Sequence, residues 1–243
     1  MAAASSKATG PRPRSAGSRA FLMACALLMF AGFLALGTWQ VERRAGKLEL
    51  IVQIDARVGA PLIDAPGPAA WPAITASTDA YRHVRIAGAW LPDRDTRVKA
   101  VTTLGPGDWL LTPLRTDAGF VVLVNRGFIS ADNKKAVPVP PSRAEITGLL
   151  RVNEPKGGFL RANDPAADRW FSRDVGAIAG ARGLGEVAPY FIDAAADASQ
   201  PVPMGGLTVI NLPNNHLVYA LTWFVLAAMV MAFAVRLWRG GRQ

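Results

Sequence analysis

The chain has very few residues of the kinds that build covalent or metal-centred sites. Its 243 residues include one cysteine, Cys25, and two histidines, His83 and His216. A single cysteine cannot form a disulfide within the chain, so packing alone has to stabilise any folded domain. These three residues also cannot provide the usual Cys and His spacings of a zinc site, or a Cys-x-x-Cys-His haem attachment site. A metal site built from protein ligands alone is therefore not expected.

The familiar catalytic motifs are missing as well. The sequence has no Gly-rich phosphate loop, no Gly-x-Ser-x-Gly elbow and no His-Glu-x-x-His pair. Asp93 and Asp95 form the one close pair of carboxylates that invites comparison with an acid–base site, but they follow a proline between two strands, where solvated turn residues are typical. His83 lies on a predicted strand with the opposite parity to Val84 and Ile86, which favours an exposed structural histidine. The sequence does not indicate an enzyme.

Acidic residues are absent from both ends of the chain. Residues 1–19 and 236–243 contain seven Lys or Arg and no Asp or Glu, so the formal net charge of +9 divides into +7 in these ends and +2 between them. A nucleic-acid-binding protein concentrates basic charge on its folded domain. Here the excess flanks long apolar segments, as the positive-inside rule describes for membrane proteins.

Two apolar segments are long enough to cross a bilayer. Residues 217–235 and 20–39 contain no charged side chain, and at about 1.5 Å per residue each spans roughly 30 Å as a helix. We predict transmembrane helices at 20–40 and 214–235. A cleaved signal peptide is the alternative for the first, because Ala35 and Gly37 have cleavage-like spacing, but the apolar run is longer than a typical signal core.

The remaining segments complete the predicted topology. Residues 1–19 are predicted to be a disordered cytosolic tail, although a short transit peptide would have a similar composition. Residues 236–243 are the second cytosolic tail, and 41–213 form an extracytoplasmic domain. We therefore expect a two-pass protein of the bacterial inner membrane with a periplasmic domain.

The spacing of apolar runs predicts the fold of this domain. Between residues 81 and 152, short apolar runs recur roughly every ten residues and are separated by Gly, Pro or Asp, which is typical of antiparallel β structure. The pattern also predicts a helical stripe continuing beyond residue 40, a loop at 59–72, a short helix from Asp164 to about Ile178, and a strand at 190–194. The fold class is a membrane protein of the α+β type, with two transmembrane helices flanking one mostly antiparallel β domain with short helices.

The outer end of the second membrane helix carries a distinctive face. His216, Tyr219 and Trp223 occupy positions i, i+3 and i+7. One interpretation is an interfacial aromatic belt with a polar cap. The other is that His216 is a ligand or a proton-handling group, since ionisable residues at membrane depth tend to be functional.

The outer end of the first membrane helix is also polar and aromatic. Trp39 and Gln40 are followed by Arg43 and Arg44, which predicts an interfacial anchor with arginines on lipid phosphates. We also expect the two membrane helices to pack together, with Trp39 and Gln40 near the histidine face. In the predicted domain, Arg126 lies between Asn125 and Gly127, where either a strand ends in a bulge or an arginine faces a carboxylate.

Several short motifs together resemble the surfeit locus family of cytochrome oxidase assembly proteins. They cover residues 36 to 224 in the family's order. The matching pieces are Leu36-Gly37-Thr38-Trp39-Gln40 with Arg43, Arg44 and Lys47, then Thr112-Pro113-Leu114, Leu123 to Phe128, Arg169-Trp170 with Arg173-Asp174, Phe191-Ile192-Asp193, and Asn215-His216-Leu217 with Tyr219 and Thr222-Trp223.

The resemblance implies an assembly factor for a haem-copper terminal oxidase. In bacterial members it implies haem a as the cofactor, held through the histidine of the second helix, which is His216 here. The expected partners are the membrane, the catalytic subunit of the oxidase and haem synthesis enzymes, with no nucleic acid. A cofactor-free scaffold that stabilises oxidase subunits is the alternative.

On that basis we expect His216 to ligate the haem iron. Neutral imidazole is a good iron ligand, and aromatic rings offer an apolar surface to the macrocycle. Haem propionates need cations at the aqueous edge. The candidate cofactor-binding residues are His216, Tyr219, Trp223, Trp39, Gln40, Arg43, Arg44 and Arg126.

Overall fold

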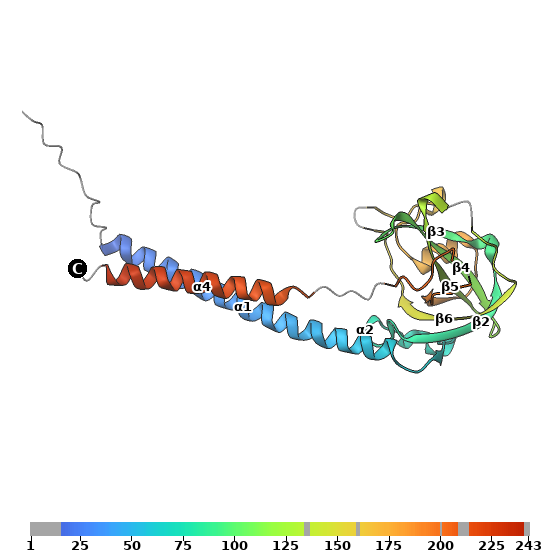
Figure 1. Cartoon of the computed structure of the whole chain (residues 1–243), viewed down its shortest axis with the longest axis horizontal. Coiled ribbons are helices and arrows are strands. Elements are labelled where there is room, and N and C mark those ends of the chain that lie inside the picture. Colours follow the sequence, from blue (N-terminus) through green and yellow to red (C-terminus); the bar gives the residue numbers. More distant parts are fainter. Residues whose placement is uncertain (1–15, 134–136, 159–160, 200, 209–213, 241–243) are drawn as a thin grey trace, which may run out of the picture. The chain divides into compact units, whose positions relative to one another are not determined.

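The computed structural model describes residues 16–133, 137–158, 161–199, 201–208 and 214–240 (Figure 1). These residues form two compact units, which we describe separately. One contains residues 1–51 and 212–243, and the other contains residues 52–211. Nearly all of the expected tail at 1–19 lies outside the described residues, and a helix has already begun at Ala16.

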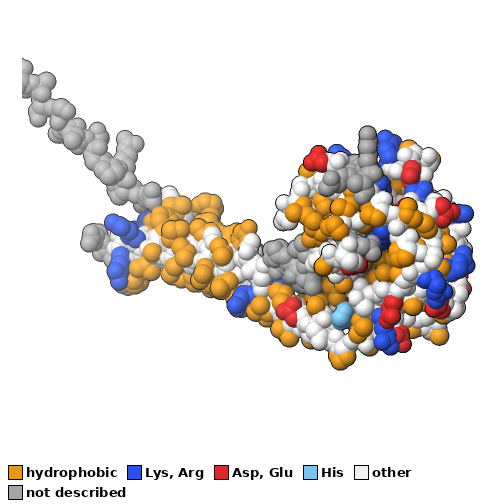
Figure 2. Space-filling model, turned by 45° about the vertical axis from the view of Figure 1, so that its right-hand side comes forward, with side chains coloured by type: hydrophobic (Ala, Val, Ile, Leu, Met, Phe, Trp, Pro, Cys, Tyr) orange, Lys and Arg blue, Asp and Glu red, His pale blue; other side chains and the backbone are white. Residues whose placement is uncertain are grey.

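Two long helices build the first unit. Helix α1 runs from Ala16 to Val58 and helix α4 from His216 to Arg239. Both are long and apolar enough to cross a membrane, and hydrophobic side chains make up most of the visible surface of this unit, with basic side chains toward its ends (Figure 2). The 43 residues of α1 give a length of about 64 Å, roughly twice the hydrocarbon thickness of a bilayer. The predicted helical stripe beyond residue 40 is therefore present as an uninterrupted continuation of α1.

Small residues allow α1 and α4 to approach closely. Ala220, Ala227 and Ala234 of α4 repeat every seven residues and are at most 5% exposed. On α1, a Cβ atom added at Gly37 would lie 2.5 Å from the ring of Phe224. Without a hydrophobic driving force inside lipid, close packing of small residues is what holds such helices together. The predicted pairing of the two helices is confirmed.

The second unit is built around a β-sheet of seven strands. Their order in the sheet is β1-β2-β6-β7-β5-β4-β3, and an additional pairing of β2 with β4 closes five of them into a barrel. Among the strands of the described residues, only β1 with β2 and β5 with β7 are parallel pairs, so the predicted, mostly antiparallel domain is confirmed. The strands are β1 (Ile63–Asp64), β2 (His83–Trp90), β3 (Thr96–Thr102), β4 (Gly105–Thr116), β5 (Val121–Ser130), β6 (Arg143–Val152) and β7 (Val187–Ala194).

The strands separate two hydrophobic cores because their side chains alternate between faces. Val122 and Val124 of β5 belong to one cluster, which also contains Val84, Leu150 and Tyr190. The neighbouring Val121 and Leu123 belong to a second cluster, whose other members include Val98, Trp170, Ile178 and Phe191. Strand β5 is consequently buried on both faces, which explains its almost continuous apolar sequence.

Helix α3 covers the second core, and its position differs from the predicted helix. The predicted helix cap at Asp164 is confirmed, since the Asp164 carboxylate accepts a hydrogen bond from the Ala167 amide. The predicted helix length, to about Ile178, is wrong. The turn stops after a 3-10 segment, η4 (Pro165–Ala167), because Asp168 adopts a left-handed conformation with φ of 50°. Helix α3 (Val175–Arg182) starts later, at a second cap formed by Asp174.

The segment predicted to be a loop at 59–72 is also partly ordered into regular structure. It contains β1 and most of the 3-10 helix η1 (Pro68–Ala73), which has a proline in its first turn. The indole of Trp71 in η1 donates a hydrogen bond to the Pro66 carbonyl and packs edge-on against Phe120. Proline content identified a break in the long helix but not this short element. The remaining short helices are α2 (Ala76–Asp79), η2 (Pro92–Arg94) and η3 (Ala131–Asn133).

Candidate functional site: a histidine at the start of the second membrane helix

His216 is the first residue of α4 and bonds directly to α1. Its Nδ1 lies 2.7 Å from Oε1 of Gln40. An amide oxygen only accepts hydrogen bonds, so in this arrangement Nδ1 carries the proton and donates it. In the neutral ring, the other nitrogen, Nε2, then carries the lone pair. A histidine held in this way by a second residue is the usual arrangement of a metal-ligating imidazole.

Aromatic side chains lie along the same two helices. Trp223, two helical turns after His216, stacks on Phe33 of α1 with ring centroids 5.7 Å apart. Tyr219 and Trp39 are about half exposed, at 56% and 49%. The predicted face is thus divided between a packed part, which holds His216 and Trp223 against α1, and an open part, which presents the Tyr219 ring.

Two arginines of α1 lie one turn beyond the Trp39-Gln40 pair. The guanidinium of Arg43 lies 5.8 Å from the ring centroid of Trp39, a cation–π arrangement of residues i and i+4. Arg44 follows Gln40 by four residues and is partly buried, so it lies on the same side of α1 as the glutamine that holds the histidine.

This set of residues fits a metal that brings most of its own ligands. Among the described residues, no group of three or more His, Cys, Asp or Glu side chains could hold a metal ion. One imidazole nitrogen, aromatic rings and nearby arginines do match the needs of a haem, whose porphyrin supplies the equatorial nitrogens and whose propionates are anionic. The first unit therefore contains residues suited to an axial ligand and its surroundings.

Comparison with known proteins decides the family. The SURF1 family matches residues 27–228 of the chain. The chain belongs to the SURF1 family. It is 32% identical over 231 residues to surfeit locus protein 1 of Mus musculus, covering 86% of this chain and 72% of the mouse protein. It is also 32% identical to a SURF1-like protein of Monosiga brevicollis, over 85% of this chain and 83% of that protein. A bacterial relative, the SURF1-like protein of Rickettsia bellii, is 29% identical over 84% of this chain and 86% of its own length.

In this SURF1-family chain, Arg126 belongs to the second unit. The register of β5 against β4 shifts between the pairs Leu110 with Gly127 and Leu111 with Asn125, so Arg126 is the extra residue of a β-bulge. Gly127 has φ of 139°, a conformation that favours glycine. The predicted bulge is confirmed, but the strand does not end there, because β5 continues to Ser130.

The bulge directs the Arg126 side chain into a buried position. Arg126 is 8% exposed, and this burial lowers the pKa of its guanidinium, while the charge of Asp95 opposes the effect. Nη2 donates a hydrogen bond of 3.3 Å to the Pro138 carbonyl, and the guanidinium lies 5.8 Å from the ring centroid of Trp90. Nη1 has no hydrogen-bond partner within the described part of the chain.

Asp95 is not the solvated turn residue that the sequence predicted. It is partly buried where β3 begins, and burial raises the pKa of its carboxyl, although Thr112 and the charge of Arg126 act in the opposite direction. The predicted turn is present as η2, and Asp93 is exposed there as expected, but the partial burial of Asp95 was not predicted. His83 has the predicted parity, since its neighbours Val84 and Ile86 are buried, but it is partly buried and not fully exposed.

The sequence did not predict the most extensive polar cluster that the structure describes, which we call the Asp193 network. Asp193 is 4% exposed, and its carboxylate accepts hydrogen bonds from Asn125 at 2.8 Å, Arg151 at 2.8 Å, Thr208 at 2.9 Å and Arg173 at 3.1 Å. Glu154 completes the network by accepting from both arginines. Asn125, Arg173 and Asp193 stand in the motifs on which the resemblance to the family rests, but only the fold shows that they meet.

Proposed function

We propose that this chain is an assembly factor for a haem-copper cytochrome oxidase and that it holds haem a through His216. Membership of the SURF1 family supports the role in oxidase assembly. The observation that carries the haem proposal is the bond between His216 Nδ1 and Gln40, since it leaves Nε2 available as an axial ligand. The catalytic subunit of the oxidase and haem synthesis enzymes are the partners we propose.

Each residue of the proposed site has a distinct task. When bound, haem a would supply an iron atom, and the imidazole of His216 would be its protein ligand. Gln40 holds the imidazole ring in one orientation, and Trp223 packs beside it against Phe33. Tyr219 offers an exposed ring for contact with the porphyrin face. Arg43 and Arg44, one turn further along α1, would hold the anionic propionates.

The proposed topology places both termini in the cytosol and the β domain in the periplasm of a bacterium. Lys7, Arg12, Arg14 and Arg19 precede the first apolar segment, and Arg236, Arg239 and Arg242 follow the second, which is the distribution of cytosolic flanks. Phosphatase and fluorescent-protein fusions at Ala2 and Gln243 should both report a cytosolic position. A terminus that is exported in an intact fusion would contradict this topology.

An absorption spectrum of the purified protein tests the proposed function. The full chain, expressed in a host that makes haem a and purified in mild detergent, should carry a Soret band at close to one haem per chain. Deleting the gene in its native host should lower the amount of assembled oxidase, and restoring it should reverse the loss. Colourless protein that still purifies with oxidase subunits would reject the haem proposal and favour the scaffold alternative.

A further inference from the structure

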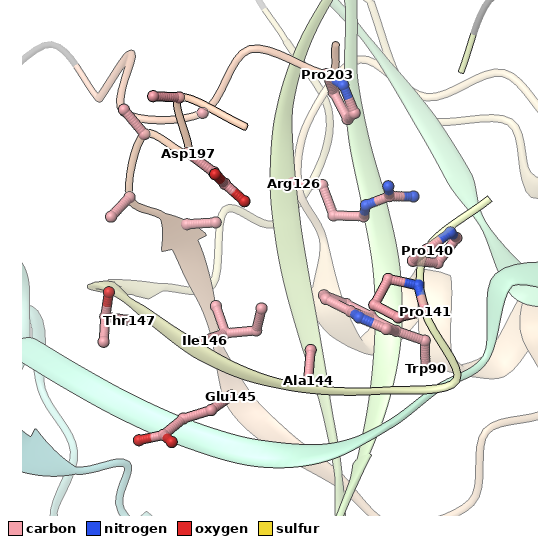
Figure 3. Close-up of a pocket in the computed structure, with 15 residues that line it drawn as sticks. Trp90, Arg126, Pro140, Pro141, Ala144, Glu145, Ile146, Thr147, Asp197 and Pro203 are labelled. Carbon is pink, nitrogen blue, oxygen red and sulfur yellow. The ribbon is translucent and has the colours of Figure 1, made fainter. Parts of the chain in front are cut away.

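The β domain contains a cavity that the proposed haem site does not use. It has a volume of about 330 Å³ and lies between the start of β6, the chain after β7, and the side chains of Trp90 and Arg126 (Figure 3). We call it the β6 pocket. About 10–15 Å³ of such volume is enough for one water, so the pocket is far larger than one buried polar atom needs.

The pocket lies where β7 ends while the first residues of the antiparallel strand β6 extend beyond it. The last β6–β7 pair is Gly148 with Ala194, and one further hydrogen bond joins the Ala195 amide to the Thr147 carbonyl. Strand β6 begins five residues earlier, at Arg143, and this part pairs only with β2. On the other side of the gap, Met204 pairs with Phe128 of β5. Among the described residues, no strand therefore pairs with the first residues of β6 on this side.

The open edge presents backbone groups to the pocket. In a strand, the amide and carbonyl of one residue point the same way, and residues two apart share that direction. The Thr147 carbonyl points toward β7, so the amide and carbonyl of Glu145 point to the same side, beyond the end of β7. Glu145 lines the pocket. An extended chain entering the pocket would find a strand edge with which to pair.

Arg126 provides a buried positive charge at one end of this opening. Its guanidinium lies beside Pro140 and over Trp90, on the far side of the pocket from Asp197 (Figure 3). The charge of Asp95 acts on this guanidinium, but its Nη1, which is buried from solvent, has no hydrogen-bond partner among the described residues. A buried charged donor without a partner is costly, and a carboxylate is the group that guanidinium binds best.

The rim of the pocket carries the opposite charge. Glu145 and Asp197 are both exposed, and hydrogen bonds from Ser199 hold the pKa of the Asp197 carboxyl below its ordinary value, so it is ionised at neutral pH. Two rim carboxylates repel a small free anion but attract a ligand that also carries a positive charge. The ligand that matches both ends is anionic at its buried tip and basic a little further out.

We propose that the β6 pocket binds the carboxyl terminus of a partner protein. The partner's last residues add to the edge of β6 as an extended strand, its terminal carboxylate pairs with Arg126, and a lysine or arginine a few residues earlier meets Glu145 and Asp197. Strand addition and capture of a terminal carboxylate are both established modes of peptide recognition. The pocket supplies the groups that each mode needs.

Two peptide libraries test this proposal on the full-length protein in detergent. Both contain random hexapeptides, one with free carboxyl termini and the other with the same sequences amidated. The unaltered protein should enrich free-carboxyl peptides at least tenfold over amidated ones, with Lys or Arg preferred before the last residue. Equal recovery from the two libraries, or no enrichment from either, would overturn the proposal without requiring any variant.

Variants then test whether Arg126 is the group that binds the terminal carboxylate. Arg126→Gln should lower the enrichment of free-carboxyl over amidated peptides at least tenfold. Arg126→Lys, which keeps the charge, should retain part of this enrichment. Arg169→Gln is the matched control, because Arg169 is an exposed arginine of the same domain that bonds Asp164 and does not line the pocket. Near-ultraviolet circular dichroism should confirm that each variant is folded. A folded Arg126→Gln protein that keeps the full preference would show that Arg126 is not the receptor.

Discussion

Replacing Asp193 with alanine should destabilise the β domain by about 3–5 kcal/mol, because removing one partner of a buried ionic network leaves uncompensated charges. Asp193 accepts hydrogen bonds from two arginines, Arg151 and Arg173. Burial lowers the pKa of Arg173, but the charges of Asp193 and Glu154 outweigh it, so the net shift is upward. Without Asp193, both guanidinium groups stay buried and only Glu154 remains to balance them.

Denaturant unfolding of the full chain in detergent, followed by tryptophan fluorescence, measures this effect. Asp117→Ala is the matched control: Asp117 also bonds an arginine, Arg143 at 2.7 Å, but both side chains are more than half exposed. An exposed pair contributes about 0–1 kcal/mol. If Asp193→Ala cost no more than the control, the network would not be what stabilises the junction of β5, β6 and β7.

Replacing His216 with alanine should remove haem from the purified protein while leaving its membrane insertion unchanged. His216 lies at the first position of α4, outside the apolar run of 217–235, so the segment that crosses the bilayer is intact. Loss of the only axial ligand that the chain is proposed to supply should lower haem occupancy at least tenfold. The measurement is the haem-to-protein ratio from the absorption spectrum.

Two further variants separate ligation from simple packing. Gln40→Leu keeps His216 but removes the acceptor for its Nδ1 proton; mutating such an orienting partner typically costs about 10–100-fold in metal affinity. Tyr219→Phe keeps the ring and should retain most of the haem. If His216→Ala kept the same spectrum at the same occupancy, His216 would not be the ligand, and Tyr219 and His83 would have to be tested in its place.

Local sequence patterns determined much of the fold. The uncharged lengths of 20–39 and 217–235 predicted two helices long enough to cross a membrane, and the ten-residue spacing between residues 81 and 152 predicted antiparallel strands. The Asn-Arg-Gly motif ending at Gly127 indicated a bulge as one of two interpretations. Each of these is a property of a few adjacent residues, where hydrophobic period, charge and glycine directly restrict the backbone.

Only the tertiary structure determined which residues distant in the sequence contact each other. Asn125 and Asp193 are 68 residues apart, and they meet because β5 and β7 pair in parallel with Asn125 opposite Asp193. The partial burial of Asp95 and the position of Arg126 at the cavity also depend on tertiary structure, because strand register and the position where β7 ends determine which side chains are removed from water. Register depends on pairing between distant segments, and that information is not present in any local stretch of the chain.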